Sequence, residues 1–65
     1  MTRRSIRRAC GWSLAEAAAA ASVSPGTARL YEADPLHVRD TYKRRSLDRV
    51  YRALAVCIGI APPPA

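Results

Sequence analysis

Two helix-start signals follow each other closely in this chain and restrict its fold more than any other feature. Ser13 and Glu16 have the spacing of a capping box, in which each side chain accepts a hydrogen bond from the other residue's backbone amide. Ser24 marks a second start, because serine caps helices and the following Pro25 fits the first helical position. Residues 14–32 are therefore predicted to form a helix, a tight turn and a second helix.

The first helix of this pair consists mostly of alanine. Residues 17–21 are an unbroken alanine run, and alanine both favours the helix and allows another helix to approach closely. The run ends at Ser22 and Val23, where the turn is predicted. Ala28 and Tyr31 lie on the same side as Val23, so we expect them to pack against the alanine helix.

One further helix is predicted on each side of this pair. The first covers residues 2–10 with Thr2 as its cap, and the last covers residues 46–58 with Ser46 as its cap. Apolar residues recur along the last helix at helical spacing and close the core: Leu47, Val50, Tyr51, Leu54 and Ile58. The sequence therefore predicts an all-α, four-helix domain over residues 1–61 with a central helix-turn-helix.

The other segments are predicted to be irregular. Residues 33–45 form a connection that is long for a compact domain, and Pro35 keeps the preceding helix from continuing into it. Leu36 and Val38 are the residues of this connection that can reach the core. Residues 62–65 form a proline-rich tail that cannot continue a helix.

The charge balance favours an anionic partner. The net charge is +6, from 11 Lys and Arg against 5 Asp and Glu, and arginine donors match phosphate oxygens and guanine edges. Nucleic acid is the first expectation, and an anionic membrane surface or an acidic protein is the alternative. Two basic groups are predicted to contact phosphate, with a solvated surface as the alternative: Arg3, Arg4, Arg7 and Arg8 in the first helix, and Tyr42, Lys43, Arg44 and Arg45 before the last.

Several other classes of protein are not expected. Cys10 and Cys57 are predicted to be buried reduced thiols, with a disulfide or redox pair as the alternative, and His37 has no partner residues for a metal site. No cofactor is predicted. No apolar run approaches the roughly 18 residues of a membrane span and no signal peptide is visible, so a cytoplasmic location is expected. An enzyme is not expected, because no nucleophile–base pair, carboxylate pair or phosphate loop can be assembled.

The pattern from Ser13 to Glu32 resembles the Cro/repressor (XRE-like) helix-turn-helix family, which has the lambda-repressor-like fold. The matching residues are Ser13, Leu14, Glu16, Ala18, Ala21, Val23, Ser24, Thr27 and Glu32. The preceding IRRACGW and the later SLDRVYRALA resemble that family's first and fourth helices, so the likeness covers most of the chain. Ser22 stands where the family has a turn glycine, which predicts some strain in the turn.

The resemblance implies a sequence-specific DNA-binding transcriptional regulator, most simply a repressor that binds a palindromic operator in double-stranded DNA as a homodimer. By position, it implies base contacts from Ser24, Pro25, Gly26, Arg29 and Leu30, and phosphate contacts from Ser13 and Thr27. Arg29 is the only long donor among the base-reading positions, suited to a bidentate guanine contact. Gly26 weakens a helix by about 1 kcal/mol relative to alanine, which fits a backbone that must approach another molecule.

Two other interpretations also fit the sequence. Residues 23–32 followed by 42–46 are similar to winged helices of the MerR and excisionase type, in which residues 33–45 would form the wing, although the helix before Ser13 argues against them. The second alternative is an antitoxin-like or anti-regulator module whose basic surface meets an acidic protein. The small set of base-reading side chains favours that alternative.

Overall fold

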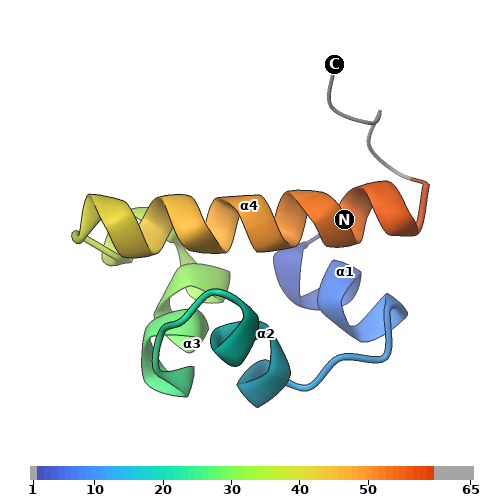
Figure 1. Cartoon of the computed structure of the whole chain (residues 1–65), viewed down its shortest axis with the longest axis horizontal. Coiled ribbons are helices and arrows are strands. Elements are labelled where there is room, and N and C mark those ends of the chain that lie inside the picture. The colour runs from blue at the N-terminus through green and yellow to red at the C-terminus, as the bar shows by residue number, and fades with distance from the viewer. Residues whose placement is uncertain (1, 60–65) are drawn as a thin grey trace.

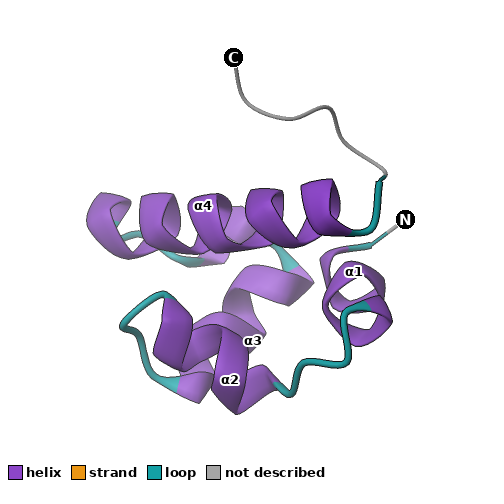
Figure 2. Ribbon diagram, turned by 45° about the vertical axis from the view of Figure 1, so that its right-hand side comes forward, coloured by secondary structure: helices purple, strands orange, loops and turns teal. Residues whose placement is uncertain are grey.

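The computed structural model describes residues 2–59, which form four α-helices and one short 3-10 helix. These are α1 (Arg3–Ala9), α2 (Leu14–Ala20), α3 (Pro25–Ala33), η1 (Pro35–His37) and α4 (Thr41–Cys57). In Figure 1, α4 runs along one side of the molecule, and α1, α2 and α3 lie together on its other side. Figure 2 shows only helices and loops over the described residues, which confirms the predicted all-α fold. The predicted tail at 62–65 lies outside the described residues.

A side-chain oxygen caps the start of each α-helix. The hydroxyl of Thr2 accepts from the Ser5 amide, and that of Ser24 accepts from the Thr27 amide. At Ser13 both hydrogen bonds of the predicted capping box are present. The helix starts at residues 3, 14 and 25 therefore follow from the local sequence, as predicted.

The predicted start of the last helix was wrong. Asp40, not Ser46, caps α4, because its carboxylate accepts from the Lys43 amide at 3.2 Å. Residues 42–45 are consequently helical and do not belong to a loop. The connection is also shorter than predicted because α4 begins at Thr41, and η1, capped by Asp34 accepting from the Leu36 amide, lies within it. Residues 33–45 contain no strand, so no wing forms there.

Helices α1 and α2 end in the same hydrogen-bonded turn, but with different residues at its left-handed position. In α1 this position is Gly11 at φ 73°, and the next amide, of Trp12, donates to the Arg7 carbonyl at 3.1 Å. In α2 it is Ser22 at φ 57°, and the amide of Val23 donates to the Ala18 carbonyl at 2.9 Å. This Schellman turn normally uses glycine, so the predicted strain at Ser22 is confirmed by its positive φ.

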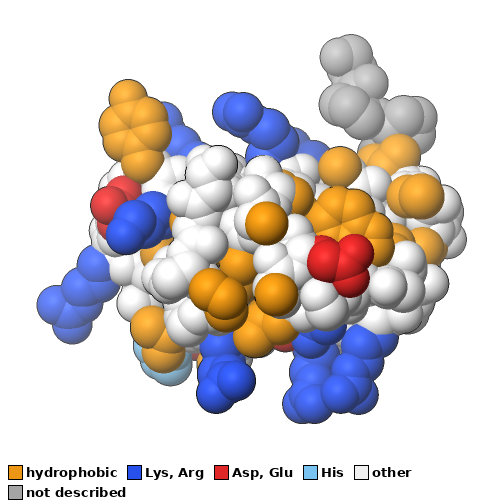
Figure 3. All heavy atoms as spheres, turned by 60° about the horizontal axis from the view of Figure 1, so that its bottom comes forward, with side chains coloured by type: hydrophobic (Ala, Val, Ile, Leu, Met, Phe, Trp, Pro, Cys, Tyr) orange, Lys and Arg blue, Asp and Glu red, His pale blue; other side chains and the backbone are white. Residues whose placement is uncertain are grey.

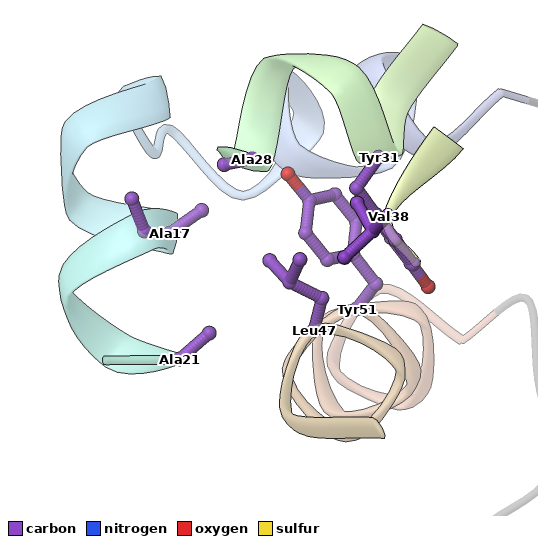
Figure 4. Packing of buried hydrophobic residues seen from close by; sticks show 8 residues of the cluster. Ala17, Ala21, Ala28, Tyr31, Val38, Leu47 and Tyr51 are labelled. Carbon is purple, nitrogen blue, oxygen red and sulfur yellow. The ribbon is translucent and has the colours of Figure 1, made fainter. Parts of the chain in front are cut away.

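The core lies where α2, α3 and α4 meet (Figure 4). Tyr31 and Leu47 are its largest fully buried side chains, and the rings of Tyr31 and Tyr51 lie 5.2 Å apart. Helix α2 contributes only alanines to this core, which lets α3 pack close to it. Val38 is buried as predicted, whereas Leu36 is 71% exposed. The core members are Ala17, Ala18, Ala21, Ala28, Tyr31, Val38, Leu47 and Tyr51.

Candidate nucleic-acid interface

The outer face of α3 displays the residues predicted to read bases. The inner residues of this helix, Ala28 and Tyr31, are buried against the core, so the opposite face points to solvent. Leu30 is 51% exposed although it is a large apolar residue. The exposed residues of this region are Ser24, Pro25, Gly26, Arg29 and Leu30, which we call the α3 surface.

Gly26 has no packing reason to be glycine. A Cβ built at this position would approach only the hydroxyl of Ser24, at 3.9 Å, which is an ordinary van der Waals contact. Its φ is not in the left-handed region, unlike that of Gly11. The chain itself therefore tolerates a side chain here, and the bare backbone of α3 is open to another molecule.

The hydroxyls predicted to contact phosphate already have roles inside the chain. Ser13 is exposed and belongs to the capping box, whose hydrogen bonds also lower the pKa of Glu16, chiefly through the Ser13 amide. Thr27 is half-buried, with its hydroxyl 2.9 Å from that of Ser24. These capping roles explain the residue types, and both side chains remain partly accessible to a ligand.

Three of the four arginines of α1 are exposed and one is buried. Arg4 and Arg8 are exposed, and no acidic side chain within residues 2–59 forms an ion pair with either. The guanidinium of Arg3 lies over the Tyr31 ring, 5.1 Å from its centre, in a cation–π contact. Arg7 is buried, so its predicted phosphate contact does not fit the structure and we exclude it from the interface.

Arg7 instead forms a two-pronged ion pair with Glu32 at the end of α3. Its Nε lies 2.6 Å from Oε2 and its Nη2 lies 3.2 Å from Oε1, while Nη1 donates to the Trp12 carbonyl at 2.8 Å. The Tyr51 hydroxyl donates to the same carboxylate. Burial alone would raise the pKa of Glu32, but the hydrogen bonds from Arg7 and Tyr51 outweigh it, and the pKa is lowered.

Arg4 and Arg29 meet at one cleft between α1, α2 and α3. The cleft has a volume of about 500 Å³. Its lining consists of Thr2, Arg4, Arg7, Leu14, Arg29, Glu32 and Ala33. Figure 3, which brings the side of the molecule away from α4 forward, shows basic side chains projecting around the margin of an apolar centre. The structure thus places Arg29, predicted to read bases, and Arg4, predicted to contact phosphate, on the same cleft.

The predicted basic segment before the last helix does not remain together. Because residues 42–45 are helical, Tyr42 and Arg45 point to solvent while Arg44 is half-buried. The Tyr31 hydroxyl of α3 donates to Asp48 of α4, so the inner faces of these helices oppose each other and their outer faces point away. Tyr42 and Arg45 are therefore not part of the α3 surface. The exposed Arg49 and Arg52 lie on the same helix face as Tyr42 and Arg45. This continuous face was missed from the sequence because the helix was predicted to begin after Arg45.

The two cysteines are free thiols. The prediction that both are buried was wrong, because neither is fully buried. Cys10 is half-buried and its thiol donates to the Leu54 carbonyl at 3.5 Å, whereas Cys57 is exposed. Burial, with a smaller contribution from Cys57, raises the pKa of the Cys10 thiol.

The described residues offer neither a metal cluster nor a membrane-spanning helix. Over residues 2–59, no three His, Cys, Asp or Glu side chains gather closely enough to hold a metal ion. None of the helices described is both long enough and apolar enough to cross a membrane.

Comparison with known protein families, with curated proteins and with solved structures finds no match for this chain. The candidate interface therefore depends on the geometry of the chain's own residues.

Proposed function

We propose that this protein is a sequence-specific DNA-binding regulator of transcription that presents the α3 surface to the major groove. The observation that supports it most strongly is Gly26, a helix-weakening residue on an exposed face where packing within the chain does not require glycine. A close approach of another molecule to the α3 backbone accounts for it. The resemblance of residues 13–32 to repressor-type proteins gives the same reading surface.

Arg29 is the base-reading residue of this proposal. It is exposed on the α3 surface and forms no ion pair within the described residues, so its guanidinium is available to a guanine edge. A bidentate contact of this kind contributes about 1–3 kcal/mol of discrimination between bases. Leu30, exposed beside it, suits contact with a thymine methyl group.

The surrounding residues supply sequence-independent affinity. Arg4 lies on the same cleft as Arg29, and Arg8 is exposed one helical turn further along α1. Both arginines are suited to phosphate, together with Ser13 and Thr27 at the helix starts. In this proposal the protein acts as a homodimeric repressor on a palindromic site, with its two α3 helices about 34 Å apart, one turn of DNA.

The test is to select binding sites from a random duplex library with the full chain and then to measure affinity against salt concentration. We expect an enriched inverted repeat and a steep loss of affinity with salt. Arg29→Gln should relax the preference at one base position, whereas Arg4→Gln should weaken all duplexes alike and reduce the log–log salt slope by about 0.9. Arg52→Gln, the same charge change on α4, is the matched control and should alter neither quantity. Equal affinity for all sequences, or affinity independent of salt, would overturn the proposal.

A further inference from the structure

The outer face of α4 has a stripe of three arginines with an apolar side chain at each end. Tyr42, Arg45, Arg49, Arg52 and Val56 recur every three or four residues and therefore lie on one face of the helix. We call these five residues the α4 stripe. The buried Leu47, Tyr51 and Leu54 occupy the opposite face of the same helix. The arginines of the stripe are exposed, Tyr42 is 87% exposed, and Val56 is half-buried.

A shallow groove follows this stripe. It has a volume of about 580 Å³ and is lined by Arg45, Asp48, Arg49, Arg52, Ala53 and Val56. Ala53 and Val56 give it an apolar floor between the arginines. The groove lies on the side of α4 opposite the buried Leu47 and Tyr51, which pack into the core shared with α3. A duplex held at the α3 surface would thus leave this groove open.

The positive charge of the stripe has no counterpart within the described residues. Arg45, Arg49 and Arg52 form no ion pair there. The nearest acidic side chain on the helix is Asp48, and it already accepts the hydrogen bond of the Tyr31 hydroxyl. Like charges spaced three and four residues apart on a helix repel one another, so an anionic partner would stabilise this face.

A second copy of the chain is not a suitable partner for this face. The net charge is +6, and the structure already engages every one of the five acidic residues internally. Glu16 completes a capping box, Glu32 pairs with Arg7, Asp34 and Asp40 cap η1 and α4, and Asp48 binds Tyr31. Copies that each carry this positive net charge repel one another, so a second copy is a poor partner for the stripe.

We propose that the α4 stripe docks an acidic, amphipathic segment of another protein. Carboxylates of such a segment would pair with Arg45, Arg49 and Arg52, while its apolar side chains would pack on Val56 and Tyr42. A nucleic-acid backbone matches this face less well, because it offers no apolar group to pack on Tyr42 and Val56. The proposal does not depend on DNA binding by α3.

The probe for the test is a synthetic helix-forming peptide with glutamates along one face and leucines along the other. Titrated into the full chain, it should shift the backbone NMR signals of residues 42–56. The triple variant R45Q/R49Q/R52Q should bind it at least about tenfold more weakly, from the loss of three exposed charge pairs. The triple variant R4Q/R8Q/R39Q removes the same charge from exposed sites elsewhere and should retain the affinity within about twofold.

A second variant separates apolar packing from simple charge attraction. Tyr42→Ala should weaken binding of the amphipathic peptide but leave binding of polyglutamate unchanged, and the exposure of Tyr42 makes loss of folding unexpected. The proposal is overturned if the peptide shifts no signals of the stripe, if both triple variants lose affinity equally, or if Tyr42→Ala has no effect. It is also overturned if duplex DNA, and not the peptide, shifts residues 42–56. Failure of the chain to bind any DNA would overturn only the function proposed for α3.

Discussion

Arg7 and Glu32 join the first helix to the end of α3 through a buried two-pronged ion pair, with Nε–Oε2 at 2.6 Å and side-chain exposures of 9% and 8%. Because Tyr51 donates to the same carboxylate, α1, α3 and α4 meet at a single acidic group. No buried side-chain nitrogen or oxygen among the described residues lacks a hydrogen-bond partner. The contacts of Glu32 with Arg7 and Tyr51 therefore fix the orientation of α3, and with it the direction in which the α3 surface faces.

Removing one partner of this pair should be strongly destabilising. Arg7→Ala leaves the Glu32 carboxylate buried without its guanidinium, and we expect the free energy of unfolding to fall by about 3–5 kcal/mol. Urea denaturation followed by circular dichroism measures this loss. Arg4→Ala, on the solvent side of the same helix, should change the stability by less than about 0.5 kcal/mol. Equal effects of the two substitutions would contradict the structural role assigned to the pair.

The same carboxylate predicts a loss of stability in acid. The folded-state pKa of Glu32 is lowered below its unfolded value of about 4.3, so its contribution is complete above that value and disappears as the pH falls through the folded pKa. The urea midpoint should therefore decrease as the pH falls below the unfolded pKa and through the lower folded pKa. Glu32→Gln, which cannot ionise, should be less stable at neutral pH and show a flatter profile. A variant profile parallel to that of the original chain would refute the assignment.

The two Schellman turns predict opposite effects of exchanging glycine with a larger residue. Ser22→Gly removes the side chain from a left-handed position and should stabilise the protein by about 1 kcal/mol. Gly11→Ala places a Cβ at φ 73°, where no neighbour lies within 4 Å, so its destabilisation of about 1 kcal/mol should come from the backbone alone. Thermal unfolding of both variants measures these changes. A Ser22→Gly variant less stable than the original would show that the serine side chain has another role.

Gly26→Ala should separate stability from binding. Alanine is accommodated at this helical position and should stabilise the fold by about 1 kcal/mol. If DNA approaches the α3 backbone as proposed, the added methyl group should weaken binding of the selected duplex. A gel-shift titration beside a denaturation curve makes the comparison. Unchanged or improved DNA affinity would remove the main support for the proposed function.

The two thiols should react at different rates. Cys57 is exposed, whereas Cys10 is half-buried, donates to the Leu54 carbonyl and has a raised pKa, which reduces its thiolate fraction near neutral pH. Mass spectrometry after brief alkylation should therefore find Cys57 modified first. With Cys57→Ser as the control, modification of the chain should be slow until denaturant is added. Preferential labelling of Cys10 would contradict its placement against α4.

Local chemistry was sufficient to predict three of the four α-helix starts, because a capping side chain bonds to an amide within three positions of itself. Thr2, Ser13 and Ser24 each cap the helix predicted for them. Where two capping residues compete, as Asp40 and Ser46 do, the sequence alone favoured the wrong one. In the structure η1 covers residues 35–37 of the connection, and α4 begins directly after Asp40.

The sequence patterns could not predict ion pairs between residues far apart in the chain. Arg7 and Glu32 are 25 positions apart, and no sequence pattern links the two residues. For Arg7, its neighbours Ile6 and Cys10, both half-buried, give the available signal, since Arg7 lies beside them on the inner side of α1. The exposed α3 residues were easier to predict, because amphipathic periodicity already separates them from Ala28 and Tyr31.

The meeting of α1, α3 and α4 at Glu32 also makes the domain indivisible. The three participating residues come from the beginning, middle and end of the described chain, so no contiguous fragment shorter than residues 7–51 contains them all. A peptide of α2 and α3 alone would expose Tyr31 to water and leave Glu32 unpaired. The helix bearing Arg29 is therefore not a portable module: grafting it into another protein would require the whole domain to accompany it.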